Sequence, residues 1–308
     1  MKSKKEDYMR SLGTKIYSYR KAKKMSREEF CEEEEEITIR NLGNIERGKV
    51  LPNLITLQYI AKRLEINLSE LVDEEQEKIP ERYSKLKYRL LRIPLYGDPE
   101  AISQQKEIFN EIEEKLFDYL PNSEKLAIEI LKGVKQTHLE EKLDFSKSIL
   151  DNHFSHLINK TAYDLNNLLL IQLYFSHFYH EPYEEASFEP ILNQLIFQSQ
   201  EAIDMEALLI ILLFTHVASI YVKNKKYKNL LELTHWAQSL MKRTEDYQKK
   251  PIIDMIEGKY WLFEQGEKEK AWSKYENGAS YAEMVGNDFL AEKIREEYQK
   301  DLQKIETK

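Results

Sequence analysis

Residues 38–44 carry side chains that can read the edges of DNA bases. Arg40 can donate two hydrogen bonds to guanine, and Asn41 can exchange two with adenine. Asn44 lies one helical turn further along, on the same face as Arg40 and Asn41, and is a third candidate. Thr38 stands where the helix would begin. We predict that Thr38, Arg40, Asn41 and Asn44 bind DNA from the major groove.

A second group of residues flanks this helix and suits the DNA backbone. Ser26 and Arg27 open the preceding helix, where backbone N–H groups and a cation can hold a phosphate. Arg47 and Lys49 follow the base-reading helix. We expect these four residues to contact phosphates.

Short helices must position these side chains, and residues 12–72 predict five of them. Leu12, Ile16 and Tyr19 recur at the spacing of one helix face. Ser26 followed by Glu29 three residues later is a capping box that opens the second helix.

Nearby capping and helix-breaking residues also mark where the later helices begin and end. Thr38 is the expected N-cap of the third helix, and Gly48 with Pro52 ends it. A fourth helix is predicted over residues 54–64, and a fifth starts at Leu68 after a cap near Asn67. Two short helices joined by a turn are typical of a helix-turn-helix domain.

Three segments resemble the Xre/Cro-type helix-turn-helix family. They are residues 25–30, residues 44–52 with Ile45-Glu46 and Pro52, and residues 57–64. The chain departs from the family at Arg27, where Gln is usual, and in the turn, where five glutamates (residues 32–36) replace the usual glycine region. These glutamates are a solvated helix end, a means of rejecting non-specific DNA, or a segment that docks onto a basic surface when DNA is absent.

Composition favours an all-α chain of two domains. The 308 residues include only 9 Gly and 8 Pro, which leaves little for long loops. Residues 1–72 hold 15 basic and 12 acidic residues, a charge of +3, and the remainder holds 31 and 42, a charge of −11. This charge asymmetry suits an N-terminal domain that binds DNA and a C-terminal body that binds a different partner.

The body is predicted to be helical throughout. We assign residues 1–72 to the helix-turn-helix domain, 73–80 to a linker and 81–308 to the body. Within the body, the small and aromatic pattern from Ala218 to Ala237 is echoed from Gly258 to Gly278. This echo is similar to tetratricopeptide (TPR) helix pairs, which stack into a superhelix whose concave face commonly grips a peptide.

The sequence lacks the motifs that are typical of several classes of enzyme and of metal-binding proteins. No phosphate-binding glycine loop, nucleophile elbow or zinc-protease motif is present, so we expect no enzyme and no cofactor. The histidine pairs 153/156 and 177/180 lack acidic residues at metal-site spacing, so we expect no metal.

The most apolar run, residues 207–217, is shorter than the ~20 residues of a membrane span. With Cys31 as the single cysteine and a charged N-terminus, we expect a cytoplasmic protein.

Motifs along nearly the whole chain resemble the Rgg family of peptide-sensing regulators, in its ComR-like group. The motifs are residues 26–28, 59–64, 79–83, 87–90 with 94–96 and Pro99, 116–121, 250–251 and 259–262. The resemblance implies a transcription activator whose DNA-binding domain is held against the TPR body. A short hydrophobic pheromone peptide then releases it and promotes homodimerisation, partly by exchange of the C-terminal helix, from a chain that is monomeric without peptide. The dimer binds an inverted repeat in double-stranded DNA at competence or bacteriocin genes.

The resemblance also implies particular residues. Arg40 matches an arginine that contacts DNA in one state and an acidic TPR residue in the other. The expected acidic position directly after Pro121 is Asn122 here, so Glu124 is the nearest substitute. The peptide-binding positions fall at Gln105, Leu212, Lys293 and Ile294, with Gln105 replacing a lysine and Lys293 suited to a peptide carboxylate. An alternative function is a TPR interaction scaffold tethered to DNA without peptide control.

Overall fold

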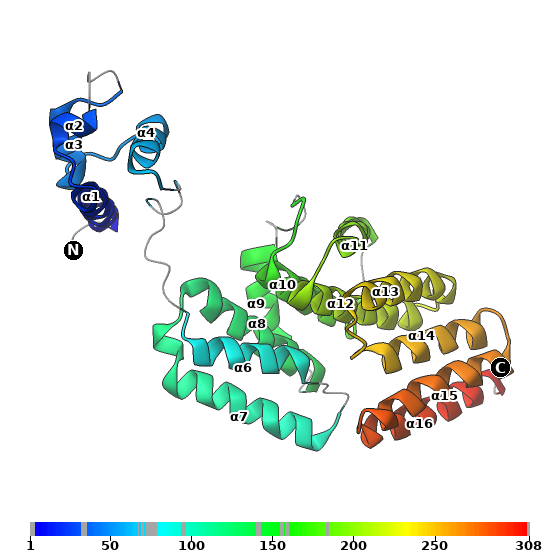
Figure 1. The fold of residues 1–308 in the computed structure, drawn as a ribbon. Coiled ribbons are helices and arrows are strands. Elements are labelled where there is room, and N and C mark those ends of the chain that lie inside the picture. The colour runs from blue at the N-terminus through cyan, green and yellow to red at the C-terminus, as the bar shows by residue number, and fades with distance from the viewer. Residues whose placement is uncertain are drawn as a thin grey trace. The chain divides into compact units, whose positions relative to one another are not determined.

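The computed structural model describes residues 4–31, 36–66, 68, 71, 79–93, 97–139, 143–154, 157, 160–182 and 185–306. The chain divides into two compact units, Met1–Pro80 and Glu81–Lys308, here called the N-terminal and C-terminal units. Every regular element in the described ranges is a helix, which confirms the predicted all-α class (Figure 1). The predicted linker, residues 73–80, lies outside the described residues except for Ile79 and Pro80.

The N-terminal unit surrounds one small hydrophobic core. Its helices are α1 (Lys4–Ala22), α2 (Arg27–Cys31), α3 (Ile39–Glu46) and α4 (Leu54–Leu64). Leu12 and Ile16 from α1 pack with Leu42 of α3 and Ile60 of α4, and all four are buried. Most of the predicted fifth helix lies outside the described residues, although Leu71 is buried in this core. The five glutamates also lie outside them, apart from Glu36.

The hydrogen bonds of the predicted helix N-caps are present in the structure. The Ser26 amide donates to Glu29 Oε2 at 2.6 Å, and the Glu29 amide donates to Ser26 Oγ at 3.1 Å, which is the predicted capping box. Thr38 Oγ1 accepts the Asn41 amide at the start of α3. Gly48 follows α3 with φ of +66°, a conformation that suits glycine.

The C-terminal unit is a stack of helices that runs from α6 to α16 (Figure 1). Its elements are α6 (Glu81–Arg92), α7 (Pro99–Lys115), η1 (Phe117–Tyr119), α8 (Asn122–Leu139), α9 (Asp144–His153), α10 (Leu165–His177), α11 (Glu185–Ser199), α12 (Asp204–Lys223), η3 (Tyr227–Asn229), α13 (Leu230–Thr244), α14 (Lys250–Phe263), α15 (Lys268–Met284) and α16 (Asp288–Glu306). Consecutive helices pair as α12 with α13 and α14 with α15. Alternate helices α8, α10, α12, α14 and α16 also contact one another in series, which is the packing of stacked helix pairs.

Small residues set the distance between α14 and α15. A Cβ atom added at Gly258 would lie 2.4 Å from the ring of Tyr275. One added at Gly278 would lie 2.6 Å from the carbonyl oxygen of Pro251. The two glycines of the repeated pattern therefore allow α14 and α15 to approach each other closely.

Helix α12 is the most apolar element of the C-terminal unit. It is long and apolar enough to cross a membrane by length and composition, but 67% of its apolar window is buried inside the protein. Ile210, Phe214 and Val217 are fully enclosed by neighbouring helices. Helix α12 therefore serves as the core helix of this unit.

The last helix, α16, is held by a buried charge cluster. Asp301 is fully buried and accepts hydrogen bonds from Lys259 on α14, from Tyr275 Oη at 2.7 Å on α15, and from Lys304 Nζ at 2.7 Å. Lys259 also donates to Glu297 Oε1 at 2.7 Å. One carboxylate thus ties α16 to both preceding helices.

Candidate DNA-binding interface and its acidic counterpart

Helix α3 presents the predicted base-reading residues from a fixed scaffold. Arg40 is exposed and Asn41 is half-buried, while Thr38 is exposed and caps the helix. Among the described residues, Arg40 has no hydrogen-bond or ion-pair partner, so its guanidinium is free to bind a ligand. Leu42, Gly43 and Ile45 of the same helix are buried, which orients the opposite face outward.

Asn44 and Arg47 are joined to each other. Arg47 donates from Nε to the Gly43 carbonyl at 2.8 Å and from Nη2 to Asn44 Oδ1 at 3.0 Å. The amide oxygen of Asn44 is therefore occupied and its NH2 group remains as a donor. In this arrangement Asn44 suits an acceptor such as a purine N7 or a phosphate oxygen better than bidentate binding of adenine.

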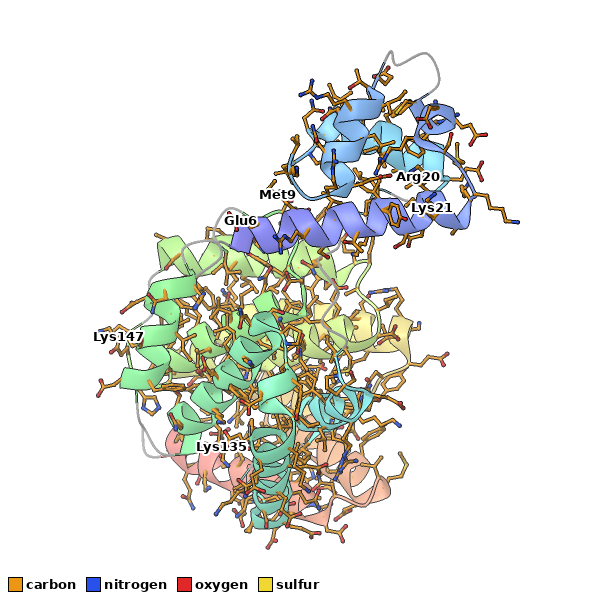
Figure 2. All side chains as sticks on the ribbon, turned by 90° about the vertical axis from the view of Figure 1, so that its left-hand side faces the viewer. Glu6, Met9, Arg20, Lys21, Lys135 and Lys147 are labelled. Atoms are coloured by element: carbon orange, nitrogen blue, oxygen red, sulfur yellow. The ribbon has the colours of Figure 1, made fainter. Side chains whose placement is uncertain are left out.

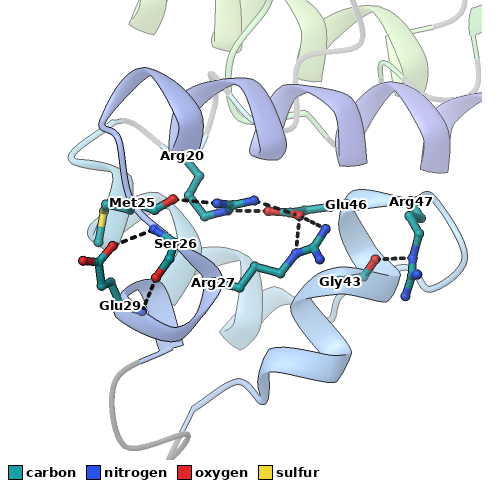
Figure 3. A network of polar contacts seen from close by, with 8 residues as sticks. All are labelled: Arg20, Met25, Ser26, Arg27, Glu29, Gly43, Glu46 and Arg47. Carbon is teal, nitrogen blue, oxygen red and sulfur yellow. Dashed lines mark hydrogen bonds and ion pairs between the residues drawn. The ribbon is translucent and has the colours of Figure 1, made fainter.

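A buried ion-pair network fixes α3 to the two helices before it (Figure 3). Glu46 is almost fully buried and accepts from Arg20 Nε at 2.6 Å and Arg20 Nη2 at 3.1 Å. Arg27 Nε donates to Glu46 Oε2 at 2.7 Å, and Arg20 Nη1 donates to the Met25 carbonyl at 2.6 Å. Two guanidinium groups thus neutralise one carboxylate at the junction of α1, α2 and α3.

Arg20 and Glu46 were not among the predicted site residues, although the sequence carries a signal for Arg20. It stands four residues after Ile16 on the buried stripe of α1, where a polar residue needs a partner. In Figure 2, Arg20 and Lys21 lie toward one end of α1, and Glu6 and Met9 lie toward the other.

The predicted phosphate contacts have different surroundings. Arg27 is shared with Glu46 and its side chain is 36% exposed, so the ion pair orients a guanidinium that still reaches the surface. The hydroxyl and amide of Ser26 are used in the capping box. Arg47 and Lys49 are exposed after α3. Among the predicted DNA-binding residues, the exposed cations are therefore Arg40, Arg47 and Lys49, and Arg27 is partly exposed.

The predicted acidic counterpart, Glu124, already has partners within the C-terminal unit. Glu124 lies on α8, and its Oε2 atom accepts from Tyr83 Oη and from Lys87 Nζ, each at 2.6 Å. Lys87 also donates to Asn166 Oδ1 at 3.2 Å. Burial and the Glu124 carboxylate raise the pKa of Tyr83, which therefore stays protonated as a donor. The negative charge of Glu124 is thus balanced by Lys87.

Comparison with known proteins bears on both units. The sequence profile of the ComR tetratricopeptide family matches residues 80–298, which is most of the C-terminal unit. The chain belongs to the ComR tetratricopeptide family. No curated protein sequence matches the chain.

Solved structures of ComR proteins match nearly the full length of this ComR-family chain. ComR from S. thermophilus, in complex with DNA and its signalling peptide ComS, is 28% identical, covers 94% of this chain and 99% of its own, and has a TM-score of 0.68. ComR from Streptococcus vestibularis with its cognate signaling peptide XIP is 29% identical, with coverages of 95% and 98% and a TM-score of 0.66. Its apo form is 29% identical, with coverages of 96% and 99% and a TM-score of 0.64.

The four predicted peptide-binding residues lie on three helices of this ComR-family chain. Gln105 on α7 is 7% exposed, and its Oε1 atom is buried with no partner in the described part of the structure. Leu212 on α12 is partly buried against the core. Lys293 on α16 is exposed and pairs with Glu296 at 2.8 Å, whereas Ile294 is 1% exposed and packs in the core. Among the described residues, no hydrogen bond or ion pair joins any two of these four.

The histidines lie among helices rather than around a common centre. His177 is buried, and burial lowers the pKa of its ring. His180 Nε2 lies 2.9 Å from the Thr137 carbonyl oxygen. His153 is exposed, and His156 lies outside the described residues. Within the described ranges, no group of three or more His, Cys, Asp or Glu residues could hold a metal ion.

Proposed function

We propose that this chain is a quorum-sensing transcription activator that binds a short hydrophobic pheromone peptide, dimerises and binds an inverted repeat in a promoter. The observation that carries this proposal is the similarity, over 94% of the chain, to a ComR protein solved with both DNA and its signalling peptide. The function needs no catalytic residue and no cofactor, and it is exercised in the cytoplasm. Its targets are competence or bacteriocin genes. A scaffold without peptide control is not favoured, because two of the similar structures contain a signalling peptide.

The DNA-binding role belongs to residues 1–72, which a linker, residues 73–80, joins to the body. Arg40, Asn41 and Asn44 read bases, while Ser26, Arg27, Arg47 and Lys49 contact phosphates and Thr38 fixes the start of the helix. The support for this assignment is the exposed Arg40 guanidinium on a capped helix, held in place by the buried Glu46 network.

Peptide binding and dimerisation belong to residues 81–308. Gln105 offers a buried acceptor without a partner, Leu212 an apolar surface, and Lys293 a cation for the peptide carboxylate. Ile294 supports Lys293 from the core side of α16. Without peptide the chain is a monomer, and Arg40 pairs with Glu124 of the body. Since Lys87 already holds Glu124, this inhibitory contact requires Arg40 to displace or join Lys87.

The proposal is tested by measuring mass and DNA affinity of the full-length protein with and without peptide. The probes are synthetic peptides encoded by short reading frames beside the gene and a duplex selected from a random pool. Light scattering is expected to show a shift from monomer to dimer with one of these peptides, accompanied by tighter duplex binding. A dimer of equal DNA affinity with every peptide and without any would contradict peptide control.

A further inference from the structure

The C-terminal unit contains two separate hydrophobic cores. A small core joins α6 and α7 to α8 at Ile128, and a large core runs from α8 to α16. Leu131 of α8 packs against both cores, and Leu91 of α6 reaches the large one. Lys87 of α6 adds a hydrogen bond to Asn166 of α10 at 3.2 Å. We call α6 and α7 the front layer and α9 to α16 the main stack, and α8 is the helix that they share.

A polar junction joins the last residue of α6 to the loop between α13 and α14. Arg92 Nη2 donates to Asp246 Oδ2 at 2.6 Å, and the side-chain amide of Gln248 donates to the Arg92 carbonyl. The backbone amide of Gln248 donates to Asp246 Oδ1 at 3.2 Å, which fixes the loop. Asp246 and Gln248 follow Arg92 by 154 and 156 positions in the chain. We call Arg92, Asp246 and Gln248 the clasp, because they tie the front layer to the main stack.

The closed clasp leaves two polar atoms without partners. Arg92 Nε and Gln248 Oε1 are both buried, and neither has a hydrogen-bond partner in the described part of the chain. A buried polar atom without a hydrogen bond destabilises the conformation that buries it. Opening of the junction would expose both atoms to water and so offset part of the loss of the ion pair. The two atoms therefore reduce the free-energy difference between a closed and an open clasp.

The residues predicted to bind peptide are divided between the two parts. Gln105 lies on α7 in the front layer, whereas Leu212 lies on α12 and Lys293 and Ile294 lie on α16 in the main stack. A peptide that contacts all four residues must touch both parts, so its fit depends on the distance between them. We propose that the clasp closes the front layer over a bound pheromone peptide and holds the peptide in place. This inference rests on the proposed function and adds the contact that controls how long the peptide stays bound.

The clasp and the peptide stabilise each other in this scheme. The peptide enters while the clasp is open, and its contacts with both parts favour the closed state. A ligand that prefers the closed state binds more weakly when that state becomes less populated. Loss of the clasp therefore shortens the residence time of the peptide.

The test compares two arginines of α6 that each bind one carboxylate. Arg92→Met breaks the clasp, whereas Arg82→Met breaks a bond to Glu111 Oε1 of 2.6 Å that stays within the front layer. The first measurement is the release rate of a dye-labelled synthetic peptide, the one that converts the wild type to a dimer. The second is the distance between spin labels on Gln104→Cys of α7 and Lys242→Cys of α13, measured by electron paramagnetic resonance. Both labelled positions are exposed, and the natural cysteine is buried.

Arg92→Met is expected to release the peptide about tenfold faster and to add a longer separation between the labels, while Arg82→Met matches the wild type in both measurements. Asp246→Asn, which removes only the charge, should repeat the result of Arg92→Met. Faster release with an unchanged separation would mean that Arg92 touches the peptide itself, and this result or an unchanged release rate overturns the inference. If the wild type binds none of the peptides, the proposed function fails, and the label separations alone still decide whether the clasp holds the two parts together.

Discussion

The two units each hold a helix in place with a buried carboxylate, but they do so with different cations. In the N-terminal unit, Glu46 is bound by the planar guanidinium groups of Arg20 and Arg27. In the C-terminal unit, Asp301 is bound by the ammonium groups of Lys259 and Lys304 with a tyrosine hydroxyl. Arginine forks fix both distance and direction, whereas an ammonium group acts as a point charge with rotatable donors.

This difference matches what each helix must do in the proposed function. Helix α3 must keep one orientation to read bases, and three helices meet at Glu46. Helix α16 is the one proposed to exchange between copies. Because every copy carries the same Lys259 and Tyr275, an exchanged α16 finds identical partners for Asp301 in the second copy. Glu124, which Lys87 holds, is a second carboxylate bound by a rotatable ammonium group.

The largest effect is expected from Glu46→Ala. Removal of this carboxylate leaves the buried Arg20 and the partly buried Arg27 uncompensated, which costs about 3–5 kcal/mol of the free energy of unfolding of the N-terminal unit. Urea unfolding measures this loss, with Glu65→Ala as the control, since Glu65 is 82% exposed and pairs with Lys23 at the surface. A loss as small as that of the control would show that the network does not hold α3.

A smaller loss, about 2–4 kcal/mol at neutral pH, is expected from Asp301→Asn. Burial opposes ionisation of Asp301, but Lys259 and the bonds from Lys259, Lys304 and Tyr275 outweigh burial and lower its pKa. A lowered pKa in the folded state means that the stabilisation is complete above the ordinary carboxyl range and is lost as pH falls below it. The difference between wild type and variant should therefore shrink below about pH 4. Hydrogen exchange of residues 288–306 reports the loosening of α16, and a pH-independent difference would contradict the role of the charge.

The start and stop of the helices around the candidate site were predictable from the sequence, because caps act over three or four residues. Ser26 with Glu29 and Thr38 with Asn41 show this directly. The small residues Gly258 and Gly278 at the close packing of α14 and α15 belong to a pattern that recurs after 40 or 41 residues, which the sequence shows.

The buried ion pairs were not predictable in the same way. Arg20 and Glu46 are 26 residues apart, and Lys259 and Asp301 are 42 apart. Nothing in local spacing tells which of many charged residues will be buried together. The same holds for Lys87 and Glu124, so the sequence offered Glu124 as an open acceptor whereas the fold gives it a partner.

A more modest effect, on regulation, is expected from Lys87→Met. This variant leaves Glu124 with the Tyr83 hydroxyl alone and makes its charge available to Arg40. DNA binding without peptide is expected to weaken on the order of fivefold, because the inhibitory pair becomes stronger. Fluorescence anisotropy measures this change, and the double variant Lys87→Met/Glu124→Gln, which lacks the inhibitory carboxylate, should bind DNA at least as tightly as the wild type. Unchanged affinity in the single variant would exclude Glu124 as the partner of Arg40.

The most direct test of the account is the DNA affinity of Arg40→Ala, measured by fluorescence anisotropy on a duplex selected by the wild type. Arg40 is exposed, is unpaired among the described residues and lies outside the Glu46 network, so its removal should leave the unfolding curve unchanged. We predict a loss of about 10- to 100-fold in affinity for the selected duplex and a smaller loss on random DNA. Wild-type affinity in the folded variant would contradict the assignment of α3 as the base-reading helix.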